Sequence, residues 1–350
     1  MQRIEVSGLL RALDALRGRT WYLHLETTAG AYTEGGFGAF IRNARIVVRG
    51  AAVRGNGPYR AGLETETGWV YAEGLTDWET DAGGRLLMAG YDGEGRVTVC
   101  CELSPTPFEV EGKQRRIAPP VAEEAPAAGP PPSPERAVLA VFAHPDDETF
   151  GCGGTLALYA RAGVPVTYAC ATRGEMGRNM GKPSFASRET LADLRVRELT
   201  AACAALGVRD LRLLGVWDKT SEFRDRDELA GRIGAILAEV KPSLLITQHP
   251  EFGGHPDHCA VGAAAIAAVR RLPPAERPRV HCMISPRLAE GAGLEVRTID
   301  VEAGLAAKMA ATAAHRSQSE AMLQRTAVNP EEAAQRRERV RTERYVVVEV

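Results

Sequence analysis

The stretch that decides the fold is Ala137–Glu148, which reads Ala-Val-Leu-Ala-Val-Phe-Ala-His-Pro-Asp-Asp-Glu. Its first seven residues are apolar without interruption, which is typical of a strand buried on both faces of a parallel sheet. Phe150–Ala162 has the length and spacing of a helix, and Gly163 is its expected C-cap. A buried strand followed directly by a helix predicts an α/β fold. Functional groups in such folds collect at the carboxyl ends of the strands.

A second predicted strand end carries a similar polar cluster. Ser243–Thr247 is predicted to be a strand, Gln248–Gly254 a loop that contains glycine, and Asp257–Arg271 an Ala-rich helix. The sequence at His255–His258 is His-Pro-Asp-His. Two strand ends are therefore expected to present His and Asp side chains toward one rim of the sheet.

The two clusters together contain the residue types of a zinc hydrolase site. Three protein ligands leave the fourth position of zinc for a water, whose pKa the metal lowers from about 16 to roughly 7. The neighbouring carboxylates of Asp146 and Asp147 repel each other unless a cation lies between them. One of the two is therefore expected to bind the metal while the other reaches the water.

At these residues the chain resembles the LmbE-like, or PIG-L, family of zinc-dependent N-acetylglucosaminyl deacetylases, which includes the deacetylases of mycothiol and bacillithiol synthesis. The resemblance covers Ala137–Gln318 and rests on several separated pieces. These pieces are His144–Glu148, Gly151–Gly154, Thr172–Glu175, Arg195–Leu199, Leu206-Gly207, Asp218, His255–His258 and His315–Gln318.

The resemblance implies a role for each polar group of the two clusters. Zinc would be held by His144, Asp147 and His258, one ion per chain, with Fe²⁺ as an alternative metal. Asp146 would be the general base that takes a proton from the water. His255 would stabilise the oxyanion of the tetrahedral intermediate.

Three more residues, Glu175, Arg195 and Asp218, match positions that lie at the sugar in relatives. One position departs from the pattern of some relatives, which carry a mobile Tyr where this chain has Gly253. Either the oxyanion has one donor fewer here, or His249 or another group substitutes for the Tyr.

Several neighbouring residues have two interpretations. Glu148 and Asp257 are expected to hydrogen-bond the ligating imidazoles, although Asp257 has the N-cap of its helix as an equal alternative. His315 is expected either beside the site or as a cation at a helix C-terminus. The glycines of Gly151–Gly154 fit close packing of loop and helix better than a nucleotide-binding turn. Cys152 fits a small buried residue better than a ligand.

A change in composition predicts two domains joined by a linker. Residues 112–135 hold seven prolines together with Ala and Glu, which is typical of a semi-rigid linker. We expect a β-rich accessory domain of unknown role over 1–111, this Pro/Ala-rich linker, and an LmbE-like deacetylase domain over 136–350. The last is expected to be a Rossmann-like α/β fold with a mainly parallel sheet and helices on both faces.

The first 111 residues carry short β-branched and aromatic runs between Gly-rich turns, such as Thr20–Leu25 and Trp69–Ala72. This pattern predicts an antiparallel β-rich domain. Trp21, Trp69 and Trp78 lie here, with core packing and a sugar-stacking surface as the alternatives.

The C-terminal part is expected to alternate strands with helices. The predicted strands are Arg279–Ser285, Val296–Val301 and Tyr345–Val350, and the predicted helices are Glu302–Ala314 and Pro330–Tyr345. Arg173–Ser187 is expected to be a long loop at the active rim, where long loops shape substrate pockets.

Composition excludes several classes of protein. The sequence contains no run of 18 apolar residues, so no membrane span is predicted. Its N-terminus lacks a signal-peptide pattern. Seven cysteines without Cys-x-x-Cys spacing fit a reducing compartment, so a cytoplasmic enzyme is expected. A net charge of −2 gives no footprint for nucleic acid. The expected partner is a small-molecule N-acetyl sugar, and a homo-oligomer is left open.

The leading hypothesis is zinc-dependent hydrolysis of the acetamide of an N-acetylglucosamine-containing small molecule, which releases acetate and a free amine. One alternative keeps the zinc but changes the substrate to a non-sugar or thiol-conjugate N-acyl amine. Another is a metal-bound, carbohydrate-binding regulator. Asp146 and His255 argue against the regulator, because a pure binding site needs neither a base nor an oxyanion donor.

Overall fold

The computed structural model describes residues 1–30, 38–120, 131–285 and 293–350. By its internal contacts the chain forms two units. The first unit is Met1–Val110 with Gly177–Arg188, and the second is Glu111–Met176 with Glu189–Val350. We call Gly177–Arg188 the inserted segment, because the chain contributes it to the first unit from within the sequence of the second. The division into domains at residues 111 and 136 stays a prediction, and part of the predicted linker lies outside the described residues.

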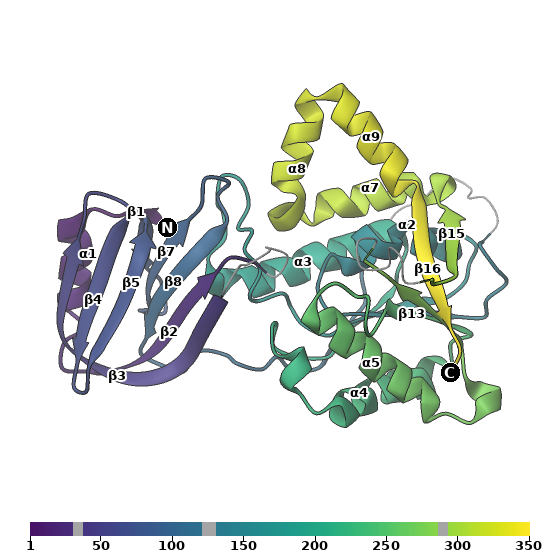
Figure 1. Ribbon diagram of the computed structural model, residues 1–350, viewed down its shortest axis with the longest axis horizontal. Helices are drawn as coiled ribbons and strands as arrows, with labels where there is room; N and C mark the ends of the chain where they lie inside the picture. Colours follow the sequence, from purple (N-terminus) through teal and green to yellow (C-terminus); the bar gives the residue numbers. More distant parts are fainter. Residues whose placement is uncertain (31–37, 121–130, 286–292) are drawn as a thin grey trace. The chain divides into compact units, whose positions relative to one another are not determined.

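The first unit is built on an antiparallel sheet, which confirms the β-rich prediction. The strands, in the order in which they pair, are β1 (Gln2–Arg3), β6 (Asp77–Thr80), β7 (Leu86–Tyr91), β8 (Val97–Ser104), β2 (Thr20–Thr28), β3 (Gly38–Arg54), β4 (Tyr59–Thr65) and β5 (Trp69–Leu75). Helix α1 (Val6–Asp14) lies against this sheet (Figure 1) and buries Leu9 and Leu13 in the core of the unit.

The tryptophans of this unit separate into two kinds. Trp21 is 5% exposed, and its Nε1 donates a hydrogen bond to the Leu16 carbonyl at 2.8 Å. Trp69 on β5 is 69% exposed. Core packing therefore holds for Trp21 and is wrong for Trp69.

The second unit has a mainly parallel sheet, as predicted. The parallel strands are β10 (Val138–Phe142), β11 (Val166–Cys170), β12 (Asp210–Leu213), β13 (Leu244–Gln248) and β14 (Arg279–Met283). Antiparallel strands complete its edges, namely β9 (Arg115–Ile117), β15 (Val296–Asp300) and β16 (Thr342–Val348). The strand order is β15-β16-β14-β13-β10-β11-β12-β9, so β10 lies in the middle of the sheet.

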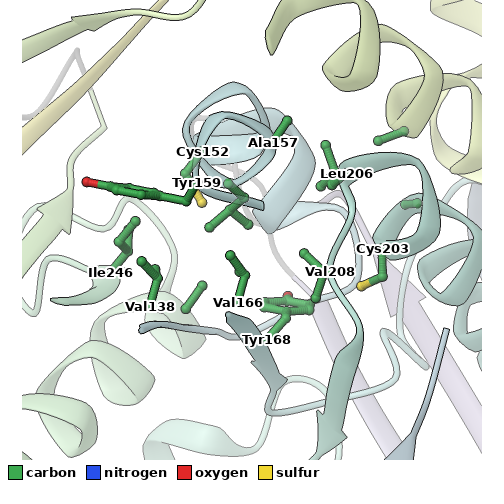
Figure 2. Packing of buried hydrophobic residues seen from close by; sticks show 14 of the residues in the cluster. Val138, Cys152, Ala157, Tyr159, Val166, Tyr168, Cys203, Leu206, Val208 and Ile246 are labelled. Carbon is green, nitrogen blue, oxygen red and sulfur yellow. The ribbon is translucent and has the colours of Figure 1, made fainter. Parts of the chain in front are cut away.

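Helices cover both faces of this sheet. The longer helices are α2 (Asp147–Arg161), α3 (Arg188–Leu206), α4 (Arg226–Val240), α5 (Pro256–Arg270), α7 (Leu305–Ala314), α8 (Arg316–Val328) and α9 (Pro330–Val340), and the 3-10 turns are Ser221–Phe223, Pro274–Glu276 and Glu302–Gly304. Residues of α2, α3 and α7 form one apolar core with one face of the strands, shown in part in Figure 2. Helices α4 and α5 lie side by side (Figure 1) and form the other core.

Helix α2 is interrupted one and a half turns after it begins. Cys152 has non-helical angles there (φ −134°, ψ 18°). Glu343 of β16 accepts hydrogen bonds from the N–H groups of Gly154 (2.8 Å) and Thr155 (2.9 Å), so it caps the part of the helix after the break. The Lys308 ammonium lies 2.6 Å from the same carboxylate.

Some element boundaries differ from the prediction. Helix α2 begins at Asp147 rather than Phe150. The predicted helix Pro330–Tyr345 ends at Val340, because the β-branched residues that follow Thr342 pair with β14 and β15 as β16. Within the described residues no helix has both the length and the apolar character that crossing a membrane requires.

Candidate active site

The polar clusters lie at the ends of two neighbouring strands. Strands β10 and β13 pair in parallel, so their carboxyl ends meet at the same edge of the sheet. The first cluster follows β10, and the second follows β13 across a short loop. His144 Nδ1 and His258 Nε2 consequently lie 3.1 Å apart although the two residues are distant in sequence.

Three donor atoms converge on one point. Asp147 Oδ1 is 3.2 Å from His258 Nε2, and Asp147 Oδ2 is 3.6 Å from His144 Nδ1. The carboxylate of Asp147 thus lies beside both imidazoles, with one oxygen near each ring nitrogen. Two imidazoles and a carboxylate whose nitrogen and oxygen atoms lie this close together can surround a divalent cation. Imidazole and carboxylate are both ligands that zinc accepts.

Hydrogen bonds fix which ring nitrogen of each His faces that point. His144 Nε2 lies 3.1 Å from Asp218 Oδ1 and 3.2 Å from Asp257 Oδ2, so this nitrogen donates to the carboxylates, and Nδ1 is the ring atom that faces the convergence point. His258 Nδ1 lies 2.9 Å from the Gly253 carbonyl oxygen, which leaves Nε2 for the metal. This arrangement of carboxylate or carbonyl behind imidazole is usual for metal-binding His.

Among the described residues, two sets of donor atoms, one atom from each residue, lie within 4.8 Å of one another: His144, His255 and His258, and His144, Asp218 and Asp257. The second set contains carboxylates that already accept backbone N–H bonds from neighbouring loops. In the first set, one nitrogen of His255 accepts a backbone N–H. Asp147 Oδ2 likewise accepts two N–H bonds, from the His144 backbone and from Gln248, so these bonds do not choose among the sets, and the set with Asp147 stays a prediction.

Gln248, which sequence reasoning missed, orients the carboxylate of this set. Its Nε2 donates to Asp147 Oδ2 at 2.8 Å, and its Oε1 accepts from the Ala143 N–H at 3.2 Å. The backbone N–H of His144 donates to the same Asp147 oxygen at 2.8 Å. The available signal was a buried polar residue that ends the apolar strand β13 beside the second cluster.

Asp146 adjoins the convergence point in a constrained conformation. Its φ of 100° lies in the left-handed region, which is uncommon for a residue with a side chain. Its Oδ2 lies 3.1 Å from Arg195 Nη2. Burial raises the pKa of Asp146 to about 6, against the opposing charge of Arg195. A carboxylate with such a pKa exchanges protons near neutral pH, as a general base must.

Arg195 is buried among acceptors of the second unit. Besides Asp146 it binds the carbonyl oxygens of Gly174 (3.1 Å) and Pro145. These bonds make it a support for the first cluster, and its predicted place at the sugar stays a prediction.

His255 begins helix α5 as its N-cap, because its Nδ1 accepts the N–H of Asp257 at 3.1 Å. The N-cap alternative for Asp257 is therefore wrong. Asp257 instead accepts the N–H groups of Lys219 (2.8 Å) and Ser221 (2.9 Å) and lies behind His144.

The His255 ring lies edge-on to the His144 ring with 4.9 Å between centroids. Burial, together with the charges of His144 and His258, lowers the pKa of His255 to about 4. A neutral ring whose Nδ1 accepts a hydrogen bond carries its proton on Nε2, so His255 presents an N–H donor.

Glu175 and Asp218 are both buried and linked to each other. Asp218 donates its backbone N–H to Glu175 Oε2 at 3.3 Å, and its Oδ2 accepts the Met176 N–H at 2.9 Å. Burial raises the pKa of Glu175, and the Asp218 charge adds to this. Burial alone would raise the pKa of Asp218 also, but the His144 charge holds it well below its usual value. A contact of either residue with a sugar stays a prediction.

Glu148 does not support a ligating imidazole directly. Its Oε1 lies 2.6 Å from His315 Nε2 and accepts from Thr149 Oγ1, while its Oε2 accepts the Asp146 N–H at 3.0 Å. His315 is fully buried where α7 ends and α8 begins. The Glu148 charge raises the pKa of His315 against the opposing effect of burial. The two residues form a buried pair beneath Asp146.

A cavity of about 230 Å³ opens beside the convergence point. Asp147 and His258 form part of its wall, and Phe142, Phe150 and Met283 supply apolar surface. The site therefore has room for a small substrate next to the metal-binding atoms.

The glycine turn serves close packing. A Cβ at Gly151 would lie 2.4 Å from Met283 Sδ, and one at Gly154 would lie 2.4 Å from Val301. Cys152 between them is fully buried in the apolar core (Figure 2), where burial raises the pKa of its thiol. The interpretation as a small buried residue fits these observations.

Family models match both parts of the chain. A model described as GlcNAc-PI de-N-acetylase (PIG-L) matches residues 139–269. A model described as a protein of unknown function (DUF1806) matches residues 3–108.

Individual relatives divide in the same way. A probable N-acetyl-alpha-D-glucosaminyl L-malate deacetylase 2 of Bacillus cereus is 51% identical over 193 residues, which cover 55% of this chain and 88% of that protein. The protein of the same name in Bacillus subtilis is 49% identical over 187 residues, which cover 53% of this chain and 85% of that protein. The uncharacterized protein YojF of Bacillus subtilis is 41% identical over 116 residues, which cover 31% of this chain and 100% of that protein. The chain thus carries a DUF1806 domain and, by its match to nearly the full length of these deacetylases, belongs to the PIG-L family of de-N-acetylases.

Proposed function

We propose that this protein hydrolyses the acetamide of N-acetylglucosamine linked to L-malate, with one Zn²⁺ per chain. The observation that carries the proposal is the convergence of His144 Nδ1, His258 Nε2 and the Asp147 carboxylate, with Asp146 adjacent in sequence. The substrate is inferred from the names of the 51% and 49% identical relatives. The seven thiols, all free, fit an enzyme of the cytoplasm.

His144, Asp147 and His258 would hold the metal. A divalent metal bound there supplies an acidified water and polarises the carbonyl of the acetamide. Gln248 keeps the Asp147 carboxylate turned toward its two His partners. Asp218 and Asp257 keep the His144 ring in the tautomer that leaves Nδ1 available.

Asp146 acts as the general base. It takes a proton from the attacking water and then returns it to the nitrogen of the departing sugar amine, a role worth about 10²–10⁴-fold in rate. Arg195 holds the carboxylate in place at 3.1 Å. Its charge also opposes the rise in pKa that burial causes, so the carboxylate form persists at neutral pH.

His255 donates a hydrogen bond from Nε2 to the oxyanion of the tetrahedral intermediate. A neutral imidazole is sufficient for this, as an oxyanion-hole donor need not be charged, and one such donor is worth about 2.7–4 kcal/mol. No Tyr side chain is available at Gly253, so His255 is the donor that we assign. We retain Glu175, Arg195 and Asp218 as the proposed sugar-side residues.

Amine release from a panel of N-acetylglucosamine conjugates tests the proposal. The panel contains the malate and inositol glycosides, free N-acetylglucosamine, and N-acyl amines without a sugar. Zinc-loaded protein is compared with Asp146→Asn and with the matched control Asp14→Asn, whose residue is an exposed partner of Arg17 on the first unit.

We expect release from the malate conjugate far above release from free N-acetylglucosamine, retained in Asp14→Asn and lost in Asp146→Asn with zinc still bound. Faster amine release from an N-acyl amine without a sugar would show that the substrates are not N-acetylglucosamine conjugates. Unchanged activity in Asp146→Asn would contradict the proposal that Asp146 is the general base.

A further inference from the structure

One face of the sheet in the first unit is charged and nevertheless buried. His24 and Glu26 alternate with the apolar residues of β2, and their partners in the register are Glu102 and Cys100 on β8. His24, Glu26 and Glu102 are each at most 1% exposed. Helix α1 packs on the opposite, apolar face. A buried carboxylate is costly unless it is paired or hydrogen-bonded, so a counter-charge over this face would stabilise it.

The inserted segment supplies that counter-charge. Arg188 Nε lies 3.0 Å from Glu26 Oε2, and Arg188 Nη2 lies 3.3 Å from Glu26 Oε1. Both side chains are 1% exposed. Arg188 Nη1 also donates to the Gly177 carbonyl at 2.8 Å. A single buried guanidinium therefore ties the two ends of the segment together and fixes them to β2.

The beginning of the segment is bound to the same unit by Arg178. Its guanidinium donates to the carbonyl oxygens of Ala29 (2.7 Å) and Val97 (3.0 Å), and it lies 3.4 Å from Asp92. The Val97 N–H donates to the Arg178 carbonyl at 2.9 Å, so the backbone here extends the pairing of β8. The segment is thus held at both ends by ionic and backbone bonds.

The chain on either side of the segment leads directly to the candidate active site. Met176, the residue before it, donates its N–H to Asp218, which in turn lies behind His144. Arg188, its last residue, is the first residue of α3. Seven residues further along this helix, about 10 Å at 1.5 Å per residue, Arg195 binds Asp146.

The relatives support a working association of the two parts. In Bacillus subtilis, YojF and the L-malate deacetylase are separate proteins, and this one chain contains a counterpart of each. A chain that contains both counterparts produces them in equal amounts.

We propose that the first unit holds the inserted segment, and that Arg188 and Glu26 are positioning residues for the candidate active site. By fixing both ends of the segment, this ion pair sets where Met176 and the first turns of α3 lie, and thereby sets the support of Asp218 and Asp146. The effect on substrate binding rests on the proposed deacetylase function.

Three full-length variants test the proposal. Glu26→Gln removes the charge of the carboxylate at the same side-chain length, Arg188→Met removes the guanidinium and retains an unbranched apolar side chain, and Arg188→Lys retains the charge. Arg178→Ala removes the bonds that hold the beginning of the inserted segment. This variant replaces the buried ones in the test if they fail to fold. Glu66→Gln is the matched control, because Glu66 pairs with Arg49 at an exposed place of the same unit.

Three measurements are made on each protein. The first is the rate of chymotrypsin cleavage after Phe185, which is 41% exposed, and the second is the rate of amide hydrogen exchange in peptides that contain Met176 or the first turns of α3. The third is kcat and KM, determined together with the zinc content. We expect Arg188→Met and Glu26→Gln to be cleaved and to exchange at least tenfold faster. We also expect at least a fivefold rise in KM with one zinc retained. Arg188→Lys should recover much of each change, and Glu66→Gln should match wild type.

Cleavage equal to that of wild type in both buried variants and in Arg178→Ala would overturn the holding role. Faster cleavage without faster exchange at Met176 and α3 would overturn the positioning role. The exchange measurement needs no substrate, so a failure of the deacetylase proposal is recognised separately, as absence of turnover by wild type.

Discussion

Replacing Gln248 by Met should weaken zinc binding without removing a ligand. Met has nearly the same length but cannot donate to Asp147 or accept from the Ala143 N–H, which Gln248 does at 2.8 Å and 3.2 Å. A hydrogen bond to a charged group contributes about 1.5–3 kcal/mol. Loss of an outer partner of a metal ligand typically costs about 10–100-fold in affinity. The dissociation constant for zinc should therefore rise about 10–100-fold, which is about 1.4–2.7 kcal/mol.

The metal-free protein should also lose stability. The Ala143 N–H is buried and would have no acceptor from residue 248, at a cost of about 1–3 kcal/mol. Zinc affinity is measured by competition with a chromophoric chelator, and the free energy of unfolding by urea titration of the metal-free protein. Gln335→Met is the matched control, because Gln335 lies on α9 and bonds only weakly, at 3.3 Å, to Glu331.

The two readouts distinguish the roles of Gln248. A zinc dissociation constant within about threefold of wild type, together with a clear loss of stability, would refute the orientation of Asp147 by Gln248. The His144 N–H would then be sufficient to hold the carboxylate. A loss of affinity in Gln335→Met of the same size would show that the assay reports global destabilisation.

Three further predictions follow from individual contacts. Asp146 must be ionised to accept a proton, and its raised pKa of about 6 means that kcat/KM falls as the pH decreases through that value. A bound cation only lowers it, so an acidic limb above pH 7 in a pH–rate profile would contradict the assignment. Gly253→Ala should weaken zinc binding several-fold in the chelator assay, because the new Cβ would lie 2.8 Å from the His249 carbonyl and 3.0 Å from His258 Cβ. Unchanged affinity would show that the loop adjusts freely. Glu343→Ala should cost about 3–5 kcal/mol of stability in urea, because it leaves Lys308 buried without its partner. Glu302→Ala, at an exposed pair with Arg337, should cost less than about 1 kcal/mol.

The sequence predicted the elements that carry local signals. The apolar run before His144 specified a buried central strand, and the periodic run after Asp257 specified a helix. Adjacent strand ends then followed from the rules of parallel sheets. The same rules place His144, Asp147 and His258 close together.

Other features depend on contacts between residues distant in sequence. Gln248 ends a strand that reads as plain core, and its role appears only when β13 lies beside β10. The bonds of Arg195 to Asp146 and to two carbonyl oxygens join residues far apart in the sequence, and its predicted place at the sugar stays a prediction. Trp69 resembled a core residue in a β-branched run, but alternation along an edge strand turned it outward. Pairing partners and strand order decide such cases, and a periodic pattern contains neither.

The inserted segment also has a consequence for how this protein is synthesised. The chain passes from the first unit to the second after Val110, returns at Gly177, and leaves again after Arg188. During translation the residues of β2 and β8 emerge well before Arg188, so Glu26 must wait for its partner while the start of the second unit is made. N-terminal domains ordinarily fold first as units during synthesis. Here the N-terminal unit should reach its final stability only after about 190 residues have left the ribosome, at the usual rate of about 5–20 residues per second. A truncation at the predicted linker would therefore release the sheet without Arg188, the residue that pairs with Glu26 in the full chain.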